Sequence, residues 1–308
     1  MAQSFLACLF KSPSERRLRA GWRLVGQTAL MYLILGSVGL TASVLLIFVP
    51  GIVSSINSTV DNDVLTLFSI LASLPAITLS VFLARRFLDR RSFISLGLIL
   101  NKKSFQDLSL GILLPGLMMG LIFLIEWALG WLHFDGFAWQ SQSWSVVIGN
   151  TLIMLLVFIA VGWQEELLNR GYYLQNLVDG LNLPCAVLLS SLIFASIHLL
   201  NPNFTLTAWV GLILAGLFLA YGYMRTRQLW LPIGLHIGWN FFEGVVFGFP
   251  VSGSSFYPLV RQSVEGPSLL TGGTFGPEAG LLCLLVMVFG AFIIYWYTRS
   301  KQHVNQNI

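Results

Sequence analysis

Apolar residues fill most of this chain in long runs, and short polar segments separate these runs. Eight runs are long enough to form a helix that crosses a bilayer core, which takes about 20 residues. They span residues 24–49, 64–84, 108–131, 146–168, 184–200, 205–224, 229–248 and 278–298. The pattern predicts an all-α, polytopic membrane protein with about eight transmembrane helices and short connecting loops.

The composition supports this prediction. Hydrophobic residues make up 56% of the 308 residues and charged residues only 10%, and the mean hydropathy is +0.79. Soluble proteins carry roughly a quarter charged residues, so the composition excludes a water-soluble enzyme and a disordered chain. Cys8, Cys185 and Cys283 are far apart in the sequence, which predicts neither a disulfide framework nor a thiolate metal site.

The distribution of charge predicts the orientation in the membrane. If the N-terminus is cytoplasmic and the helices alternate, then of the 17 Lys and Arg residues only Arg261 falls on the outside. Asp61, Asp63, Asp135 and Glu265 also fall outside. Because cytoplasmic loops are enriched in Lys and Arg, both termini are expected in the cytoplasm. The excess of basic residues therefore needs no nucleic acid as a partner. Compact loops and no targeting segment suggest a bacterial cell membrane.

Polar residues within the apolar runs concentrate between residues 163 and 243. We therefore expect three parts in the chain. Residues 1–140 form a surface segment and three scaffold helices, residues 141–250 form a catalytic core of four membrane helices, and residues 251–308 form an external loop and a final membrane helix. Residues 50–63 and 250–277 are expected as external loops, and residues 278–308 as scaffold.

The fourth run ends with Glu165, Glu166 and Arg170. A spacing of four places Glu166 and Arg170 on one helical face, which favours an ion pair between them. Glu165 points about 100° away around the helix and stays free of that pair. The alternative is that all three are charges at the end of a helix, level with the lipid headgroups.

The depth of these residues favours a buried site. Helical periodicity continues to Gly180, and Pro184 suits the first turn of the next helix. Glu165 precedes Gly180 by as many residues as His198 follows Leu183. In an antiparallel hairpin the two side chains are therefore level, each about 22 Å from the connecting loop.

The seventh run contributes His236 and Asn240, which share one face, and Glu243 borders this face. A single histidine in a helix is usually a hydrogen-bonded core residue. Two histidines, a glutamate and an asparagine on three neighbouring helices are different, because each desolvated polar group costs free energy unless it has a partner. Glu126, beside two tryptophans, is interpreted as an interfacial residue.

Over roughly residues 145–245 the sequence resembles the CAAX protease and bacteriocin-processing (CPBP) intramembrane proteases. The family motifs are Glu-Glu-x-x-x-Arg, Phe-x-x-x-His and His-x-x-x-Asn. They are met in order by Glu165, Glu166 and Arg170, by Phe194 and His198, and by His236 and Asn240. One small departure is Asn169, where many members carry an aromatic residue. Eukaryotic members trim prenylated C-termini, and bacterial members are linked to bacteriocin maturation, immunity and surface-protein processing.

The resemblance implies an intramembrane endopeptidase that hydrolyses protein or peptide substrates in or at the bilayer. The residues suggest how: Glu165 is the general base, and His198 helps to hold and polarise the water. His236 and Asn240 can donate hydrogen bonds to the developing oxyanion. Glu166 and Arg170 form a supporting pair, in which Arg170 could also meet a substrate carboxylate, and Phe194 is a further supporting residue.

Two alternatives stay open. The first is a zinc ion held by Glu165, His198 and His236, because family members have been described both as metalloproteases and as glutamate-type proteases. We expect no metal, since the two histidines lie on separate helices and Asn240 is a poor zinc ligand. The second is a non-catalytic immunity or scaffold protein, or a transporter. We see no inverted repeat of the kind found in transporters, and no polar motif residue is missing.

Overall fold

The computed structural model describes residues 10, 12, 17–48 and 62–302, and it is mostly helical. A helix overlaps each of the eight predicted apolar runs. These helices are α2 (Ala20–Phe48), α4 (Asn62–Leu83), α5 (Lys102–Ala128), α6 (Trp144–Glu166), α8 (Leu183–Ser196), α9 (Leu206–Thr226), α10 (Trp230–Asn240) and α12 (Leu281–Gln302). The expected loop at residues 50–63 lies almost wholly outside the described residues.

Five stretches of helix in the described part of the chain are long and apolar enough to cross a membrane. They are Ala20–Thr41, Lys102–Ala128, Trp144–Gly180, Leu206–Thr226 and Leu281–Arg299. Helix α8 has 14 residues and α10 has 11, so each is too short to span a 30 Å core alone at about 1.5 Å per residue. The chain is thus an integral membrane protein. Eight crossings, cytoplasmic termini and the division into three parts stay predictions.

Three helices continue into π-helical segments. Segment η1 (Ala84–Leu88) follows α4, η4 (Leu167–Tyr173) follows α6, and η5 (Phe241–Val246) follows α10. Segment η4 leads without a break into α7 (Leu174–Gly180), which gives a continuous helix of 37 residues. Such π-helical segments occur often at functional sites.

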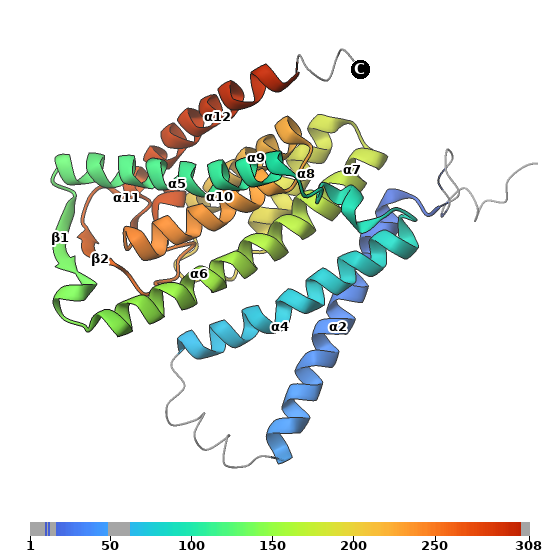
Figure 1. Cartoon of the computed structure of the whole chain (residues 1–308), viewed down its shortest axis with the longest axis horizontal. Helices are drawn as coiled ribbons and strands as arrows, with labels where there is room; N and C mark the ends of the chain where they lie inside the picture. Colours follow the sequence, from blue (N-terminus) through green and yellow to red (C-terminus); the bar gives the residue numbers. More distant parts are fainter. Residues whose placement is uncertain (1–9, 11, 13–16, 49–61, 303–308) are drawn as a thin grey trace, which may run out of the picture.

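Helix α10 is the centre of the molecule. Every residue from Leu231 to Asn240 is buried, and the helix packs against α5, α6 and α9. A Cβ atom on Gly234 or Gly238 would clash with backbone atoms of α5, so the two helices pack backbone to backbone. Small residues commonly permit such close contacts between membrane helices. Helix α12 covers α5 and α9, while α2 and α4 form a pair on the other side, with α4 against α6 (Figure 1).

The connection between α7 and α8 is as short as predicted. Helix α7 ends at Gly180, and Leu183 begins α8. The Asn182 side chain accepts a hydrogen bond from the backbone N–H of Cys185 at 2.9 Å, and Pro184 lies in the first turn. An asparagine N-cap followed by proline is a common start of a helix.

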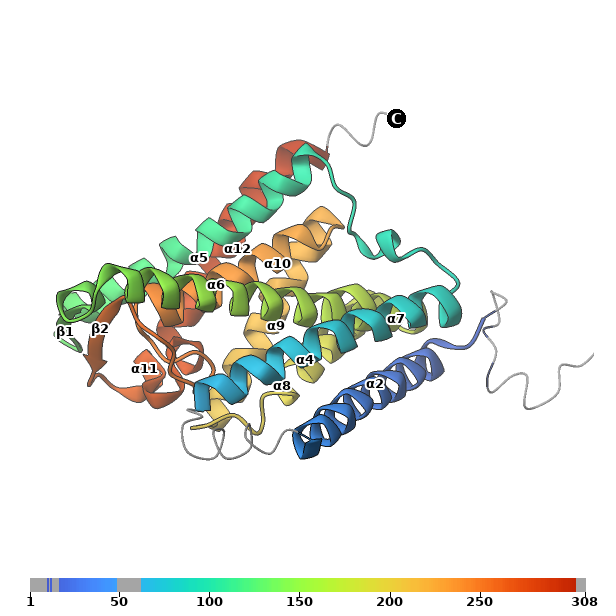
Figure 2. The same ribbon diagram turned by 60° about the horizontal axis from the view of Figure 1, so that its bottom comes forward.

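The expected external loop at residues 250–277 is folded. Strand β2 (Val260–Val264) pairs antiparallel with β1 (Leu132–Phe137), and an irregularity lies between Phe134 and Gly136. Helix α11 (Ser268–Thr271) and the short 3-10 turns η6 (Gly273–Phe275) and η7 (Pro277–Ala279) lead into α12. These elements lie at one end of the helix bundle, far from α7 (Figure 2).

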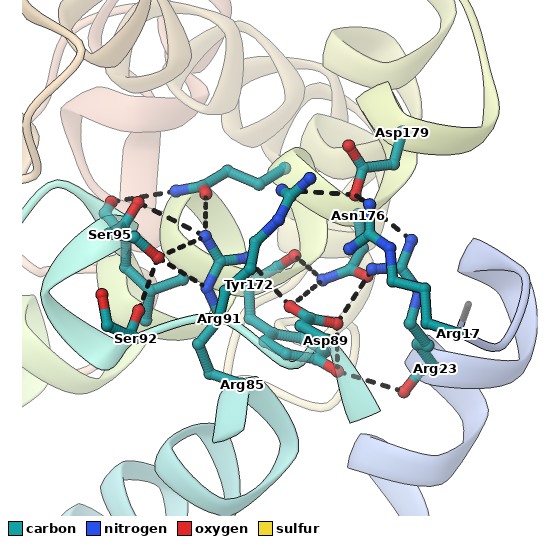
Figure 3. A network of polar contacts seen from close by, with 12 residues as sticks. Arg17, Arg23, Arg85, Asp89, Arg91, Ser92, Ser95, Tyr172, Asn176 and Asp179 are labelled. Atoms are coloured by element: carbon teal, nitrogen blue, oxygen red, sulfur yellow. Dashed lines mark hydrogen bonds and ion pairs between the residues drawn. The ribbon is translucent and has the colours of Figure 1, made fainter. Parts of the chain in front are cut away.

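A buried network of arginines and aspartates joins the elements at the other end (Figure 3). Asp89 pairs with Arg23 and with Arg85, each at 2.9 Å. Asp179 pairs with Arg17 at 3.0 Å and with Arg23 at 3.2 Å. The network therefore ties the start of α2 to the ends of α4 and α7. Removing one partner from a buried pair typically costs about 3–5 kcal/mol.

Candidate active site

Glu166 and Arg170 form the predicted ion pair. Arg170 Nη1 donates to Glu166 Oε1 at 2.8 Å, and Arg170 Nη2 donates to the backbone carbonyl of Gly216 on α9 at 2.9 Å. Both side chains are almost fully buried. The pair spans the change from α-helix to π-helix at Leu167 and fixes this segment to α9.

Glu165 is free of that pair, as expected. Its side chain keeps 19% of its exposure, and its Oε2 lies 3.9 Å from Nε2 of His198 and 3.9 Å from Nε2 of His236. The structure therefore brings together three groups from α6, from the end of α8 and from α10. The predicted level placement of Glu165 and His198 is present in the hairpin.

His198 lies just beyond its helix and not within it. The apolar run predicted a helix through residue 200, but α8 ends at Ser196 and His198 lies in the following turn. His198 Nδ1 lies 2.8 Å from the Phe194 carbonyl oxygen. Because a carbonyl can only accept, Nδ1 is the donor in this contact, and Nε2 is the nitrogen that lies toward Glu165.

Phe194 supports the site with both its backbone and its ring. Its carbonyl holds His198, while its ring lies 4.5 Å from the guanidinium carbon of Arg170. The ring also packs 5.1 Å from the His198 ring and 5.9 Å from the His236 ring. A cation over an aromatic face is attracted by the ring quadrupole, so Phe194 joins the Glu166–Arg170 pair to both imidazoles.

His236 is oriented by Glu166. His236 Nδ1 lies 2.9 Å from Glu166 Oε1, the oxygen that also accepts from Arg170. The sequence predicted Glu166 only as a partner of Arg170. A carboxylate accepts, so Nδ1 donates, and Nε2 of His236 can donate to a ligand only when the ring is protonated.

Asn240 is only 7% exposed and lines the same cavity as Glu165. Among the described residues its amide has no hydrogen-bond partner. A buried amide without a protein partner is unusual, and it is available to a bound molecule. Glu243, expected to border this face, is buried but does not line the cavity.

The cavity has a volume of about 320 Å³, which is within the usual range of ligand pockets. Four polar residues that the sequence analysis missed also line it: Gln164, Asn201, Ser252 and Glu278. Glu278 Oε2 accepts hydrogen bonds from the backbone N–H of Ser252 at 2.9 Å and from its hydroxyl at 2.6 Å. Burial raises the pKa of Glu278, while Ser252 and the two imidazoles lower it.

The interpretation of residues 278–308 as scaffold did not anticipate that Glu278 lines the cavity. An acidic residue in a glycine-rich segment, directly before an apolar helix, was the signal available in the sequence. It did not distinguish Glu278 from an ordinary charge in an external loop.

The fit of a zinc ion can be judged from the spacing of the donors. Ligand atoms about 2.1 Å from a tetrahedral zinc lie roughly 3.4 Å apart, whereas Glu165 Oε2 lies 3.9 Å from each imidazole nitrogen. Over the described ranges, no group of three or more His, Cys, Asp or Glu side chains is arranged to hold a metal ion. Both separations are therefore wider than those between the ligands of a tetrahedral zinc site.

The family comparison agrees with the motifs. Residues 147–242 match the model of the family described as Type II CAAX prenyl endopeptidase Rce1-like. We call this segment the Rce1-like domain, after the family that it resembles. The Rce1-like domain extends from α6 through α10 and contains every motif residue, which confirms the resemblance to CAAX proteases. No curated protein and no solved structure matched the chain. Glu278 and Ser252 lie outside the Rce1-like domain.

Proposed function

We propose that this protein is an intramembrane endopeptidase that hydrolyses peptide bonds of membrane-associated proteins or peptides. The Rce1-like domain supports a membrane protease of the CAAX type. One observation carries the finer proposal: Glu165 faces the cavity, and its Oε2 lies 3.9 Å from each of two imidazole nitrogens and has no hydrogen-bond partner among the described residues.

In the proposed reaction Glu165 is the general base. A water held between Glu165 and His198 gives a proton to the carboxylate while its oxygen attacks the carbonyl carbon of the scissile bond. The second O–H of this water stays intact and donates a hydrogen bond to His198 Nε2, because Nδ1 of that ring is hydrogen-bonded to the Phe194 carbonyl. General-base catalysis typically contributes about 10²–10⁴-fold to a rate.

The attack of water places a negative charge on the carbonyl oxygen, and hydrogen-bond donors are needed to stabilise it. The Asn240 amide has N–H groups that donate to no described residue. Because Asn240 is buried, these groups stabilise a negative charge more strongly than they would in water. His236 contributes a second donor, Nε2–H, when its ring is protonated, and the Glu166 carboxylate at Nδ1 stabilises that form. The carboxylic acid of Glu165 then protonates the leaving amine as the C–N bond breaks, which regenerates the carboxylate.

We propose that this step needs no metal ion, on the basis of the donor spacing. Nδ1 of His198 is hydrogen-bonded to the Phe194 carbonyl, so Nε2 of that ring can accept a hydrogen bond from the water without a metal ion. The alternative zinc site at Glu165, His198 and His236 would need these atoms to move closer together.

The test is a comparison of membrane-protein N-termini in cells that carry the native chain or the Glu165→Gln variant. The side-chain amide of the introduced glutamine has the same shape as the Glu165 carboxylate but cannot act as a base. The matched control is Glu126→Gln, because Glu126 is also buried but lies on α5, away from the cavity. Cleavage products should disappear in Glu165→Gln and persist in Glu126→Gln at equal protein levels. Identical sets of N-termini in all three samples would favour the non-catalytic scaffold.

A further inference from the structure

Glu278 is a second carboxyl group at the cavity, and the proposed reaction gives it no role. It lies in η7, whereas Glu165 lies near the end of α6, so the two acids reach the cavity from segments far apart in the sequence. Glu278 is only 5% exposed. Burying a carboxylate costs free energy unless hydrogen bonds or an opposite charge compensate for it. The partners of Glu278 therefore indicate what it can bind.

Close backbone contacts fix the segment that carries Glu278. A Cβ atom on Gly211 of α9 would clash with the Glu278 carbonyl oxygen, and one on Gly276 would clash with the carbonyl oxygen of Pro250. Gly276 also has a φ of +109°, a conformation that side chains rarely allow. The segment before α12 is thus held directly against α9 and against the segment after η5, which gives Glu278 a fixed position at the cavity.

The two oxygens of the Glu278 carboxylate have different surroundings. Oε2 accepts from the backbone N–H of Ser252 at 2.9 Å and from its hydroxyl at 2.6 Å. No described residue donates a hydrogen bond to Oε1. Because Ser252 holds one oxygen in place and Glu278 lines the cavity, Oε1 is available to a molecule bound there.

The cavity contains no permanent positive charge to balance its two acids. No Lys or Arg is found among the described residues that line it. Arg170 does not line it, and its guanidinium donates to Glu166 and to the backbone carbonyl of Gly216. The imidazoles make their ion-pair contacts with Glu165 and Glu166 and none with Glu278. A cation bound in the cavity would therefore supply the opposite charge that Glu278 lacks.

Apolar side chains make up much of the remaining wall of the cavity, among them Leu212, Phe218, Trp239 and Val251. The side chains of Lys and Arg combine an apolar stem with a charged head, and they commonly lay the stem along apolar surfaces. Aromatic rings such as that of Trp239 also attract cations. A Lys or Arg side chain therefore matches this wall better than a small inorganic cation does.

We infer that Glu278 is a specificity residue, whose carboxylate binds the positively charged side chain of a Lys or Arg close to the scissile bond of the substrate. The assignment of this cation to a substrate rests on the proposed function, whereas the preference of the cavity for a cation does not. Glu278 lies outside residues 147–242, which match the family model. An acidic side chain at the same position of a substrate is repelled.

Peptide binding to the full chain in detergent tests this inference. The chain carries Glu165→Gln, which prevents cleavage and leaves Glu278 as the one acidic residue among the described residues that line the cavity. The probes are acetylated and amidated peptides of the sequence Ala-Leu-Xaa-Leu-Ala, in which Xaa is Lys, Arg, norleucine or Glu. A further probe is the norleucine peptide with a free N-terminus.

We expect the Lys and Arg peptides to bind about 10–100-fold more tightly than the norleucine peptide, the usual range for a charge-assisted hydrogen bond. The Glu peptide should bind more weakly than the norleucine peptide. Adding Glu278→Gln should abolish these differences, because glutamine keeps an acceptor for Ser252 but carries no charge. Adding Glu126→Gln should preserve them, because Glu126 is also buried but does not line the cavity. The Tm of each variant checks that it folds.

Equal Kd values for the Lys, norleucine and Glu peptides would overturn the inference, and this comparison uses a chain that keeps Glu278. A preference for Lys that survives Glu278→Gln would overturn it as well. So would tighter binding of only the peptide with a free N-terminus, because Glu278 would then bind the end of a chain and not a side chain.

The comparison of N-termini separates this inference from the proposed function. Products that depend on Glu165, together with equal Kd values for the probes, would refute the inference and keep the proposed function. A preference for Lys through Glu278, without any product that depends on Glu165, would keep the cation site and refute the proposed function.

Discussion

His236 Nδ1 lies 2.9 Å from Glu166 Oε1, the same oxygen that accepts a hydrogen bond from Arg170 at 2.8 Å. One buried carboxylate oxygen thus fixes both the helix position and the orientation of an imidazole. Carboxylates play a similar role behind histidines at many catalytic sites, where they set the tautomer and the ring angle. The two adjacent glutamates therefore have separate tasks: Glu165 faces the cavity and Glu166 holds its walls.

A double substitution separates the two contacts of Glu166. Glu166→Gln should destabilise the protein by about 3–5 kcal/mol, because the Arg170 charge is left buried without its partner. Adding Arg170→Met removes that charge and should recover much of the lost stability, measured as Tm in detergent. Activity should stay low in the double variant, because His236 has lost its carboxylate. Recovery of activity together with Tm would show that Glu166 only pairs with Arg170.

Asn240→Ala should lower kcat by about 10²–10³-fold, the usual cost of losing one oxyanion donor. Its Tm should change little, since no described residue bonds to the Asn240 amide. Asn201→Ala is the matched control, because Asn201 lines the same cavity but donates to the Ser252 carbonyl. Steady-state kinetics on a peptide from the comparison of N-termini supplies both values. A kcat within tenfold of the native value would remove Asn240 from the mechanism.

Glu278 should make stability depend on pH. Burial raises its pKa in the folded state, so the folded chain binds a proton more tightly than the unfolded chain. Stability then falls as pH rises from the unfolded value of about 4.3 through the folded pKa. Glu278→Gln removes the loss of stability that comes from ionising the buried carboxyl. The Tm of the variant minus that of the native chain should therefore grow with pH. A difference that is constant between pH 4 and pH 8 would contradict the assignment.

Metal removal should leave activity unchanged. Both imidazole nitrogens lie 3.9 Å from Glu165 Oε2, wider than the roughly 3.4 Å between ligands of a tetrahedral zinc. Dialysis of the purified protein against a chelator, followed by metal analysis and assay, tests this directly. Activity that is lost with the metal and restored by zinc alone would establish a metalloprotease.

The helix positions could be predicted because a chain in a bilayer must satisfy its backbone hydrogen bonds within each apolar run. The Glu166–Arg170 pair followed from a spacing of four, and the approach of Glu165 to His198 followed from equal distances to a short loop. These relationships are local in sequence or are fixed by a single hairpin.

Other features depend on contacts between distant segments. The end of α8 at Ser196 could not be predicted, because the apolar run continues past this residue. The contact of His236 with Glu166 needs the packing of α10 against α6, which the glycines of α10 permit. Glu278 reaches the cavity only because the segment before α12 folds back to Ser252, and no periodicity in the sequence indicates that.

The rate of cleavage by purified Glu165→Gln tests the central claim most directly. The native chain and the variant are reconstituted in the same vesicles and given the same peptide, with equal Tm values as the measure of intact folding. If Glu165 activates the water, the variant should be slower by about 10²–10⁴-fold. A rate within tenfold of the native rate, at equal Tm, would contradict the role of Glu165 and with it the proposed mechanism.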